Sequence, residues 1–154
     1  MTPRHLLFVC TGNICRSPLA EALLRRRAGA LGLAVEVDSA GTSDEEEGNP
    51  PDRRAVEMAR RRGFELPRRQ ARQIRRPDFT RFDLILPMTR AHLRVLERLA
   101  PPEATAELRL FLDCAPEQGV RDVPDPWYGG MGDFERALDL IEAGVEGILR
   151  ELQA

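Results

Sequence analysis

The stretch FVCTGNICRSPLAEALL, residues 8–24, decides the fold, because it joins a buried strand to a helix through a short turn. The apolar run His5–Cys10 predicts the strand. The helix follows at once over 17–32, where Ser17 is expected to cap it and Pro18 suits its first turn. The turn holds two cysteines, glycine, asparagine, arginine and serine. A corner of this composition indicates a metal clip, a redox pair or a cradle for an anion.

Strands alternate with helices along the rest of the chain. The later elements are expected at 34–42 (strand), 50–64 (helix), 82–88 (strand), 90–100 (helix), 107–113 (strand) and 134–152 (helix). This order predicts an α/β fold, a three-layer doubly wound architecture with a four-stranded parallel sheet and helices on both faces. The length of 154 residues fits a single domain, 1–154.

Composition argues against several classes of protein. The net charge is −2, so nothing favours a nucleic-acid partner. No apolar run is long enough to span a bilayer and no secretory leader precedes the first strand, so membrane insertion is not expected. Three cysteines make a poor disulfide framework, which favours a cytoplasmic location. All 23 basic residues are arginine.

The spacing C-x5-R from Cys10 to Arg16 favours the anion cradle once its context is considered. Alone the spacing is a weak signal, but here a strand precedes it, a helix follows it, and Gly12 and Asn13 permit unusual backbone angles. Inward-pointing N–H groups, the helix N-terminus and the guanidinium fork of Arg16 would together hold an anion. The same positive field favours the thiolate form of Cys10, to which Ser17 could donate a hydrogen bond.

A metal site is not expected at this corner. Cys10 and Cys15 would need two more ligands, and the chain offers neither further paired cysteines nor a pair of histidines. His5 begins a strand and His92 sits on a helix, so each is expected to be a surface or capping residue. No metal and no cofactor are therefore predicted.

A thiolate in the cradle would be a nucleophile toward phosphorus, and phosphoryl transfer to it needs an acid for the leaving group. The segment RDVPDPWYGG, 121–130, offers two. Asp125 stands between prolines that stiffen the backbone, which favours it over Asp122. The only tryptophan and the only tyrosine, Trp127 and Tyr128, come next and could form the wall of a pocket for a flat ring.

Taken together, these residues resemble the low-molecular-weight protein tyrosine phosphatases over nearly the whole chain. FVCTGNICRSPLAEA fits the phosphate loop of that family, and the later motifs follow in the family's order: VDSAGT, GNPPDRRA, ARQI, FDLIL and DPWYG. The resemblance implies hydrolysis of phosphotyrosine and aryl phosphate monoesters through a cysteinyl-phosphate intermediate. It also implies the doubly wound fold and the absence of a metal.

The resemblance assigns expected roles. It implies that Cys10 attacks phosphorus, that Arg16 holds its oxygens and that Asp125 protonates the leaving phenolate. It implies that Asn13 holds the shape of the loop and that Ser17 steadies the thiolate. The expected partners are a phosphotyrosine-containing protein or a small aryl phosphate, with phosphate or a similar oxyanion in the loop. The residues expected to bind the substrate are Thr11, Gly12, Asn13, Ile14, Cys15, Arg16, Ser17, Trp127 and Tyr128.

Two other functions stay open. A thiol-dependent arsenate reductase of the same fold needs two further cysteines to relay a disulfide, and after Cys15 the chain has only Cys114. A non-catalytic phosphoprotein-binding module would keep the loop but would not need Asp125.

The chain also departs from the family's pattern at three places. Thr89 and His92 follow the third strand, and Arg69 stands before ARQ, where a histidine is common; both changes are expected in supporting structure. The acidic run 44–47 replaces an aromatic that relatives often place on the pocket wall. This run is expected to border the mouth of the anion pocket.

Overall fold

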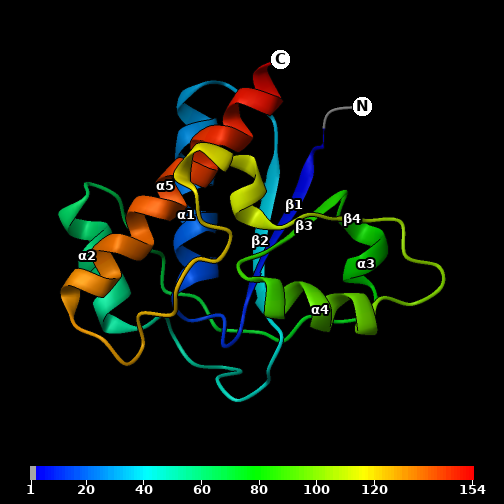
Figure 1. Ribbon diagram of the computed structural model, residues 1–154, viewed down its shortest axis with the longest axis horizontal. Coiled ribbons are helices and arrows are strands. Elements are labelled where there is room, and N and C mark those ends of the chain that lie inside the picture. The colour runs from blue at the N-terminus through cyan, green and yellow to red at the C-terminus, as the bar shows by residue number, and fades with distance from the viewer. Residues whose placement is uncertain (1–2) are drawn as a thin grey trace.

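The computed structural model describes residues 3–154 and forms a four-stranded parallel sheet with helices on both faces (Figure 1). The strand order is β2-β1-β3-β4, which confirms the predicted doubly wound α/β fold. The elements in chain order are β1 (His5–Cys10), α1 (Arg16–Ala30), β2 (Glu36–Gly41), α2 (Arg53–Arg61), α3 (Asp78–Arg81), β3 (Leu84–Pro87), α4 (Arg90–Leu99), β4 (Glu107–Leu108), the 3-10 helices η1 (Phe111–Cys114) and η2 (Pro116–Gln118), and α5 (Met131–Gln153).

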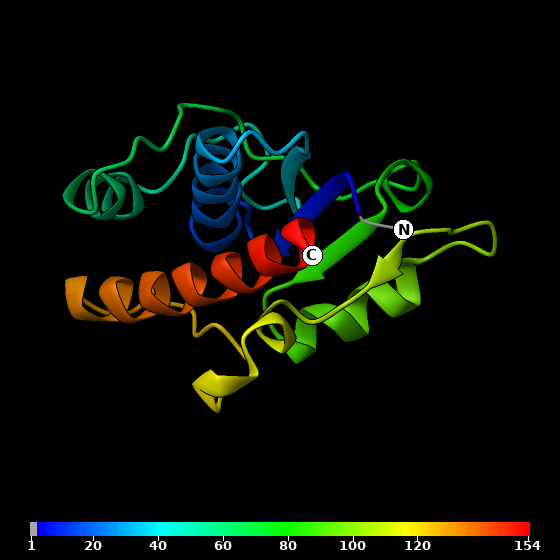
Figure 2. The same cartoon turned by 90° about the horizontal axis from the view of Figure 1, so that it is seen from above.

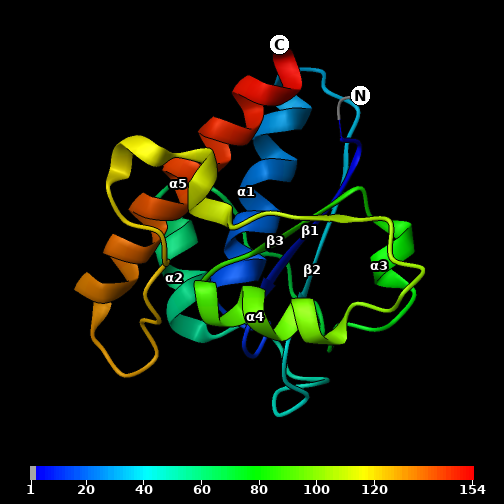
Figure 3. The same cartoon turned by 45° about the vertical axis from the view of Figure 1, so that its right-hand side comes forward.

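The central strand β1 fixes where the functional loops lie. It pairs in parallel with β2, from His5 opposite Glu36 to Cys10 opposite Gly41, and with β3 on its other side. Because all these strands run the same way, the loops that follow β1, β2 and β3 emerge at one edge of the sheet. Figure 3 shows the loops after β1 and β2 together at the lower edge, near the segment that leads into α5.

Two apolar cores lie on the two faces of the sheet. Figure 2 shows the helices that cover these two faces. On one face Phe8 packs against Phe111 in an edge-to-face contact, with ring centroids 5.6 Å apart, beneath α1 and α5. On the other face Leu7 packs with Phe79 of α3 and Leu96 of α4. This burial on both sides explains why β1 reads as a continuous apolar run. Within residues 3–154, none of the helices combines the length and apolar character needed to cross a bilayer.

The fourth strand is shorter than the sequence predicts. The alternation of 107–113 is typical of a strand, but β4 ends at Leu108, and the chain turns into η1 at Phe111. The ring of Phe111 is fully buried against Phe8 and against Gly144 of α5, so packing between helix and sheet overrides the local strand pattern. The four-residue helix α3 was not predicted, because it is too short to show a helical period.

The predicted cap of the first helix is also wrong. Residue Cys15 occupies the N-cap position and makes no side-chain capping bond, while Ser17 lies inside the first turn of α1. The Ser17 hydroxyl instead contacts the sulfur of Cys10. The remaining elements match their predictions within a few residues at each end.

We predict that Gly147→Ala destabilises the protein although alanine is the better helix former. A Cβ at Gly147 would overlap the carbonyl oxygen of Cys114, which belongs to backbone and cannot swing aside. The clash should outweigh the helix-propensity gain of about 1 kcal/mol and leave a net loss of about 1–3 kcal/mol. Gly132, in the same helix, has no atom within 4 Å of such a Cβ and is the matched control.

Urea unfolding of Gly147→Ala and Gly132→Ala measures both changes through their midpoints. We expect a lower midpoint for Gly147→Ala and an unchanged or higher midpoint for Gly132→Ala. Equal midpoints for the two variants would contradict the close approach of α5 and η1.

Candidate active site

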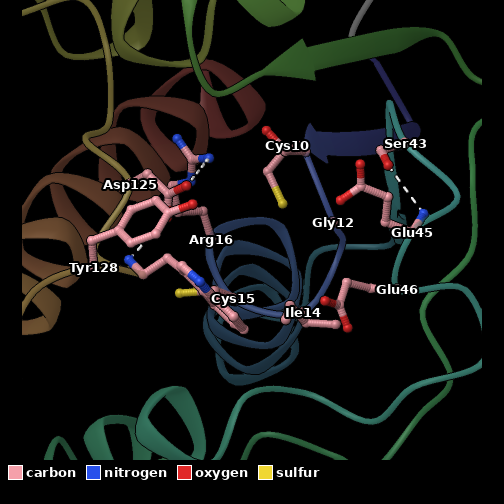
Figure 4. A pocket seen from close by; sticks show the side chains of 12 residues that line it. Cys10, Gly12, Ile14, Cys15, Arg16, Ser43, Glu45, Glu46, Asp125 and Tyr128 are labelled. Carbon is pink, nitrogen blue, oxygen red and sulfur yellow. Dashed lines mark hydrogen bonds and ion pairs between the residues drawn. The ribbon is translucent and has the colours of Figure 1, made fainter.

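A pocket at the carboxyl edge of the sheet gathers the side chains that the sequence singled out (Figure 4). The sulfur of Cys10 points into it between two walls. Asp125 and Tyr128 stand on one side, and Glu45 and Glu46 stand on the other. Its lining residues are Cys10, Thr11, Gly12, Ile14, Cys15, Arg16, Ser43, Glu45, Glu46, Asp125, Trp127 and Tyr128.

The Cys10 sulfur has a directed hydrogen-bond partner in Ser17. The two atoms, Cys10 Sγ and Ser17 Oγ, lie 3.0 Å apart, and both residues are buried. Asn13 Nδ2 donates to the same Ser17 oxygen at 2.9 Å, so the single hydroxyl proton of Ser17 is free for another acceptor. The sulfur is nearer than the alternative, the Ala40 carbonyl oxygen at 3.5 Å. Ser17 is therefore arranged to donate to a thiolate.

Asn13 holds the loop in its shape. Its φ of 59° lies in the left-handed region, and it is the sole non-glycine residue with positive φ among residues 3–154. Its side chain is 3% exposed and fully used: Nδ2 donates to Ser17 and to Ser39, each at 2.9 Å, and Oδ1 accepts from the Arg72 N–H at 3.0 Å. These bonds offset the cost of the left-handed backbone. Gly12, which was expected to share the unusual geometry, has no positive φ.

A charged network supports Asn13 from behind. Ser39 Oγ accepts from Asn13 and donates to Glu21 Oε1 at 2.6 Å. The Arg69 guanidinium pairs with the buried Glu21 carboxylate and with Asp38 Oδ1, the latter at 2.8 Å. Arg69 thus lies in supporting structure beneath the loop, where its charge compensates a carboxylate that would be costly to bury alone.

Arg16, the last residue of the phosphate loop (residues 11–16), lies beside the proposed acid, Asp125. Its side chain is buried, with Nη1 donating to the Val123 carbonyl at 2.9 Å and Nη2 lying 3.6 Å from Asp125 Oδ2. Asp125 is half-exposed at the pocket. The alternative acid, Asp122, is occupied by Arg90, which binds its carboxylate through the backbone N–H at 2.8 Å and through the guanidinium. The geometry therefore favours Asp125.

His92 is buried and its ring bonds to Thr11 rather than to a helix end, so the expectation of a surface or capping residue is wrong. It is 6% exposed, and its Nε2 lies 2.8 Å from the Thr11 hydroxyl oxygen in the phosphate loop. Within the described chain its Nδ1 has no hydrogen-bond partner. A neutral ring protonated on Nε2 fits this environment, because it buries only a lone pair at Nδ1. His92 and Leu96 are both buried one turn apart on α4, a spacing that could have revealed its inward face.

The acidic run divides into two pairs. Glu45 and Glu46 line the pocket, which agrees with the expected place of this segment. The other two residues do not line it: Asp44 is exposed and Glu47 accepts from the Gln73 backbone N–H at 3.1 Å. The loop is tied to the phosphate loop by the Ser43 N–H, which donates to the Thr11 carbonyl at 3.0 Å.

The two other cysteines differ in place. Burial and the neighbouring Cys10 raise the pKa of the Cys15 thiol well above its usual range, so Cys15 stays protonated in the lining of the pocket. Burial raises the pKa of Cys114 to about 11, and this residue lies in η1 away from the pocket. Among residues 3–154, no group of histidine, cysteine and carboxylate side chains could hold a metal ion.

The structure brings most of the candidate site residues to the pocket. Asn13 and Ser17 are buried and do not line the cavity: Asn13 bonds to the residues that support the loop, and Ser17 bonds to the sulfur of Cys10. Sequence reasoning did not single out Ser43, which lines the pocket, or the contact of His92 with Thr11. The candidates that line the pocket are Cys10, Thr11, Gly12, Ile14, Cys15, Arg16, Asp125, Trp127 and Tyr128.

Comparison with known proteins points in one direction. A model of the low molecular weight phosphotyrosine protein phosphatase family matches residues 5–154. A low molecular weight protein-tyrosine-phosphatase of Streptomyces coelicolor is 46% identical over 150 residues, which cover 94% of this chain and 91% of that protein. The crystal structure of YfkJ from Bacillus subtilis is 38% identical with a TM-score of 0.90 and covers 97% of this chain and 94% of its own. A protein tyrosine phosphatase from Entamoeba histolytica with Hepes in its active site is 33% identical with a TM-score of 0.92, covering 97% of each chain.

We predict that His92 makes the protein less stable as the pH falls from 6.5 to 4. Burial, together with the Arg16 charge and against the weaker opposing effect of Asp125 and Asp122, lowers the pKa of His92 from 6.5 to about 4. In this window the unfolded chain binds a proton that the folded protein does not, so the free energy of unfolding decreases with falling pH. At pH 5 the loss from this group should be about 2 kcal/mol.

Urea unfolding at pH 7 and pH 5 checks this for the unmodified chain and for His92→Gln, whose amide can still donate to Thr11. The Gln variant should lose less stability on acidification, because it has no group that titrates there. If the two proteins lose the same amount, His92 does not have the depressed pKa that its burial implies.

Proposed function

The chain belongs to the low molecular weight phosphotyrosine protein phosphatase family, and on this premise we propose how its own residues hydrolyse a phosphate monoester. The single observation that carries the proposal is the convergence of three groups on one pocket. Cys10, Arg16 and Asp125 all line it, and Arg16, at the end of the loop, lies 3.6 Å from the Asp125 carboxylate through its Nη2. Nucleophile, anion clamp and acid are the set that phosphoryl transfer to a thiol requires.

In the first step Cys10 Sγ attacks phosphorus and the bond from phosphorus to the aryl oxygen breaks. Arg16 and the N–H groups of the loop 11–16 hold the three remaining oxygens as their charge develops. Asp125 gives its proton to the departing phenolate, so that a neutral phenol leaves. Support for the nucleophile comes from Ser17, whose hydroxyl lies 3.0 Å from the sulfur.

In the second step a water molecule attacks the phosphorus of the cysteinyl-phosphate. Asp125, now a carboxylate, accepts the proton of this water, and the bond from sulfur to phosphorus breaks. Inorganic phosphate leaves, and Cys10 returns to a thiolate that Ser17 can again stabilise by donating a hydrogen bond. The hard displacement is thereby divided into two easier ones, and both use the same anion clamp.

The rival functions fit the pocket less well. A disulfide relay needs a cysteine beyond the loop that can approach Cys10, but Cys114 lies in η1 and does not line the pocket. A binding module has no use for an acid beside the anion clamp, yet Asp125 Oδ2 lies 3.6 Å from Arg16. The pocket therefore favours a hydrolase over both the reductase and the binding module.

The setting of the reaction is part of the proposal. All the residues with assigned roles lie at one edge of one sheet, so we assign the whole site to a single domain, 1–154. The three cysteines are free, and Cys10 must stay a thiol to act, which suits the reducing cytoplasm. The substrate is a phosphotyrosine residue or a small aryl phosphate, whose ring would lie beside Trp127 and Tyr128.

The proposed nucleophile is tested with Cys10→Ser, which we expect to lose at least about 10³-fold in turnover of para-nitrophenyl phosphate. Inorganic phosphate should still bind, because the loop and Arg16 hold the anion without the sulfur; calorimetry measures this. The control is Cys114→Ser, a thiol away from the pocket, which should keep turnover. Substantial hydrolysis by Cys10→Ser would remove it as the nucleophile.

The two glutamates on one side of the pocket lead to a proposed substrate preference. Glu45 and Glu46 line the pocket opposite Asp125 and Tyr128, so a bound peptide would pass close to two carboxylates (Figure 4). Like charges repel and unlike charges attract, mainly through the rate of association. We therefore propose that the enzyme prefers phosphotyrosine flanked by arginine or lysine over phosphotyrosine flanked by carboxylates.

For matched basic and acidic phosphopeptides we expect kcat/KM to differ about tenfold at low salt, in favour of the basic peptide. The difference should shrink at high salt, because exposed charges are screened over about 10 Å at 0.1 M ionic strength. The double variant Glu45→Gln with Glu46→Gln should lose the preference. Asp44→Asn removes an adjacent charge that does not line the pocket and should keep most of it. A preference that survives in the double variant would assign it elsewhere.

A further inference from the structure

The start of α2 contacts both of the loops that form the pocket. On one side the Asp52 N–H donates to the carbonyl oxygen of Ile14 in the phosphate loop, at 2.7 Å. On the other side the Arg54 guanidinium reaches the segment that follows Asp125. Asp52 and Arg54, two positions apart in the sequence, therefore join the anion cradle to the segment of the acid, although neither lines the pocket.

Arg54 holds the main chain of the segment 123–129, which contains Asp125 and is called the acid segment below. Its Nη1 donates to the carbonyl oxygens of Trp127 and Gly129, at 3.0 and 3.3 Å. The guanidinium carbon also lies 5.4 Å from the centre of the Trp127 ring and 4.8 Å from that of Phe134 in α5. Contacts of this kind combine hydrogen bonding with cation–π attraction, which a lysine would not reproduce in the same geometry.

Arg54 is itself fixed by Asp52. The carboxylate of Asp52, which is 8% exposed, accepts from Arg54 Nε at 3.2 Å and from Nη2 at 3.1 Å. The same carboxylate caps α2 by accepting from the Arg54 N–H at 2.8 Å. Two hydrogen bonds to the carboxylate that caps the helix leave the guanidinium little freedom. Its remaining nitrogen, Nη1, is therefore presented to the Trp127 carbonyl in one orientation.

The contact reaches the acid through a single residue. The Trp127 N–H donates to Asp125 Oδ1 at 3.0 Å, while the Trp127 carbonyl accepts from Arg54. We propose that Arg54 is a positioning residue for Asp125: it fixes the main chain at Trp127 and thereby aims the carboxyl group at the leaving oxygen. The inference rests on the proposed role of Asp125 as the acid.

Loss of Arg54 should weaken one half of the reaction selectively. Arg16 would still hold the acid segment at the Val123 carbonyl, and the phosphate loop would still be shaped by Asn13. Anion binding should therefore persist while proton donation becomes inefficient. A misplacement of about 1 Å can cost about 10²-fold in rate.

The experiment compares Arg54→Gln and Arg54→Lys with Arg53→Gln, a neighbouring exposed arginine on the same helix. The readout is kcat/KM for phenyl phosphate and para-nitrophenyl phosphate, which reports transfer to Cys10, together with inhibition by inorganic phosphate. For Arg54→Gln we expect a loss of about 10–100-fold with the poor leaving group and less than about 3-fold with the good one. Phosphate inhibition should stay within about 2-fold, and Arg53→Gln should resemble the unmodified enzyme.

Asp125→Asn, alone and combined with Arg54→Gln, identifies the route of the effect. If Arg54 acts through Asp125, the Arg54 change should cost less than about 2-fold once the acid is gone. Equal losses with and without Asp125, or a parallel loss of phosphate binding, would overturn the positioning role of Arg54 and leave the role of Asp125 intact. A loss in Asp125→Asn that does not depend on the leaving group would instead overturn the acid and, with it, the positioning role. Arg54→Lys keeps the charge and should show a smaller loss with the same leaving-group dependence; a uniform loss there also counts against the proposal.

Discussion

The left-handed turn at Asn13 is the constraint on which the rest of the site depends. A chain that leaves β1 at Cys10 and enters α1 at Arg16 must reverse within five residues, and one backbone conformation disfavoured by its Cβ makes this possible. The side chain of Asn13 stabilises that conformation through three hydrogen bonds, to Ser17, Ser39 and Arg72. One of these bonds also frees the Ser17 proton for the sulfur. The shape of the loop and the environment of the Cys10 sulfur therefore have a common cause.

Much of the fold and the pocket follows from local sequence. The apolar run of β1 shows its burial on both faces, and alternating strands and helices imply a parallel sheet whose carboxyl edge collects Cys10 and the acid segment. The sequence singles out Cys10 at the end of a strand, Arg16 six residues later and Asp125 in the loop before the last helix, and all three line the pocket. The mouth position of Glu45 and Glu46 follows from the same topology.

The parts that the sequence could not supply depend on contacts between distant segments. Phe111 leaves the strand pattern because its ring packs against Gly144 of α5. His92 turns inward because its ring hydrogen-bonds to Thr11 in the phosphate loop. Arg54 reads as one more surface arginine in a chain with 23 basic residues, all arginine. Its partners are 73 and 75 residues away in sequence, at Trp127 and Gly129, and no local periodicity reports such a contact.

Both arginines that hold the acid segment bind it through carbonyl oxygens, at Val123, Trp127 and Gly129. Every amino acid supplies a carbonyl oxygen, so these hydrogen bonds place no demand on the side chain of Tyr128, which lines the pocket between two of them. A substitution at Tyr128 can therefore change the wall of the pocket while the path of the main chain is kept. The enzyme can in this way change its substrate preference during evolution without moving Asp125, the residue proposed as the proton donor, because the two tasks fall to different side chains.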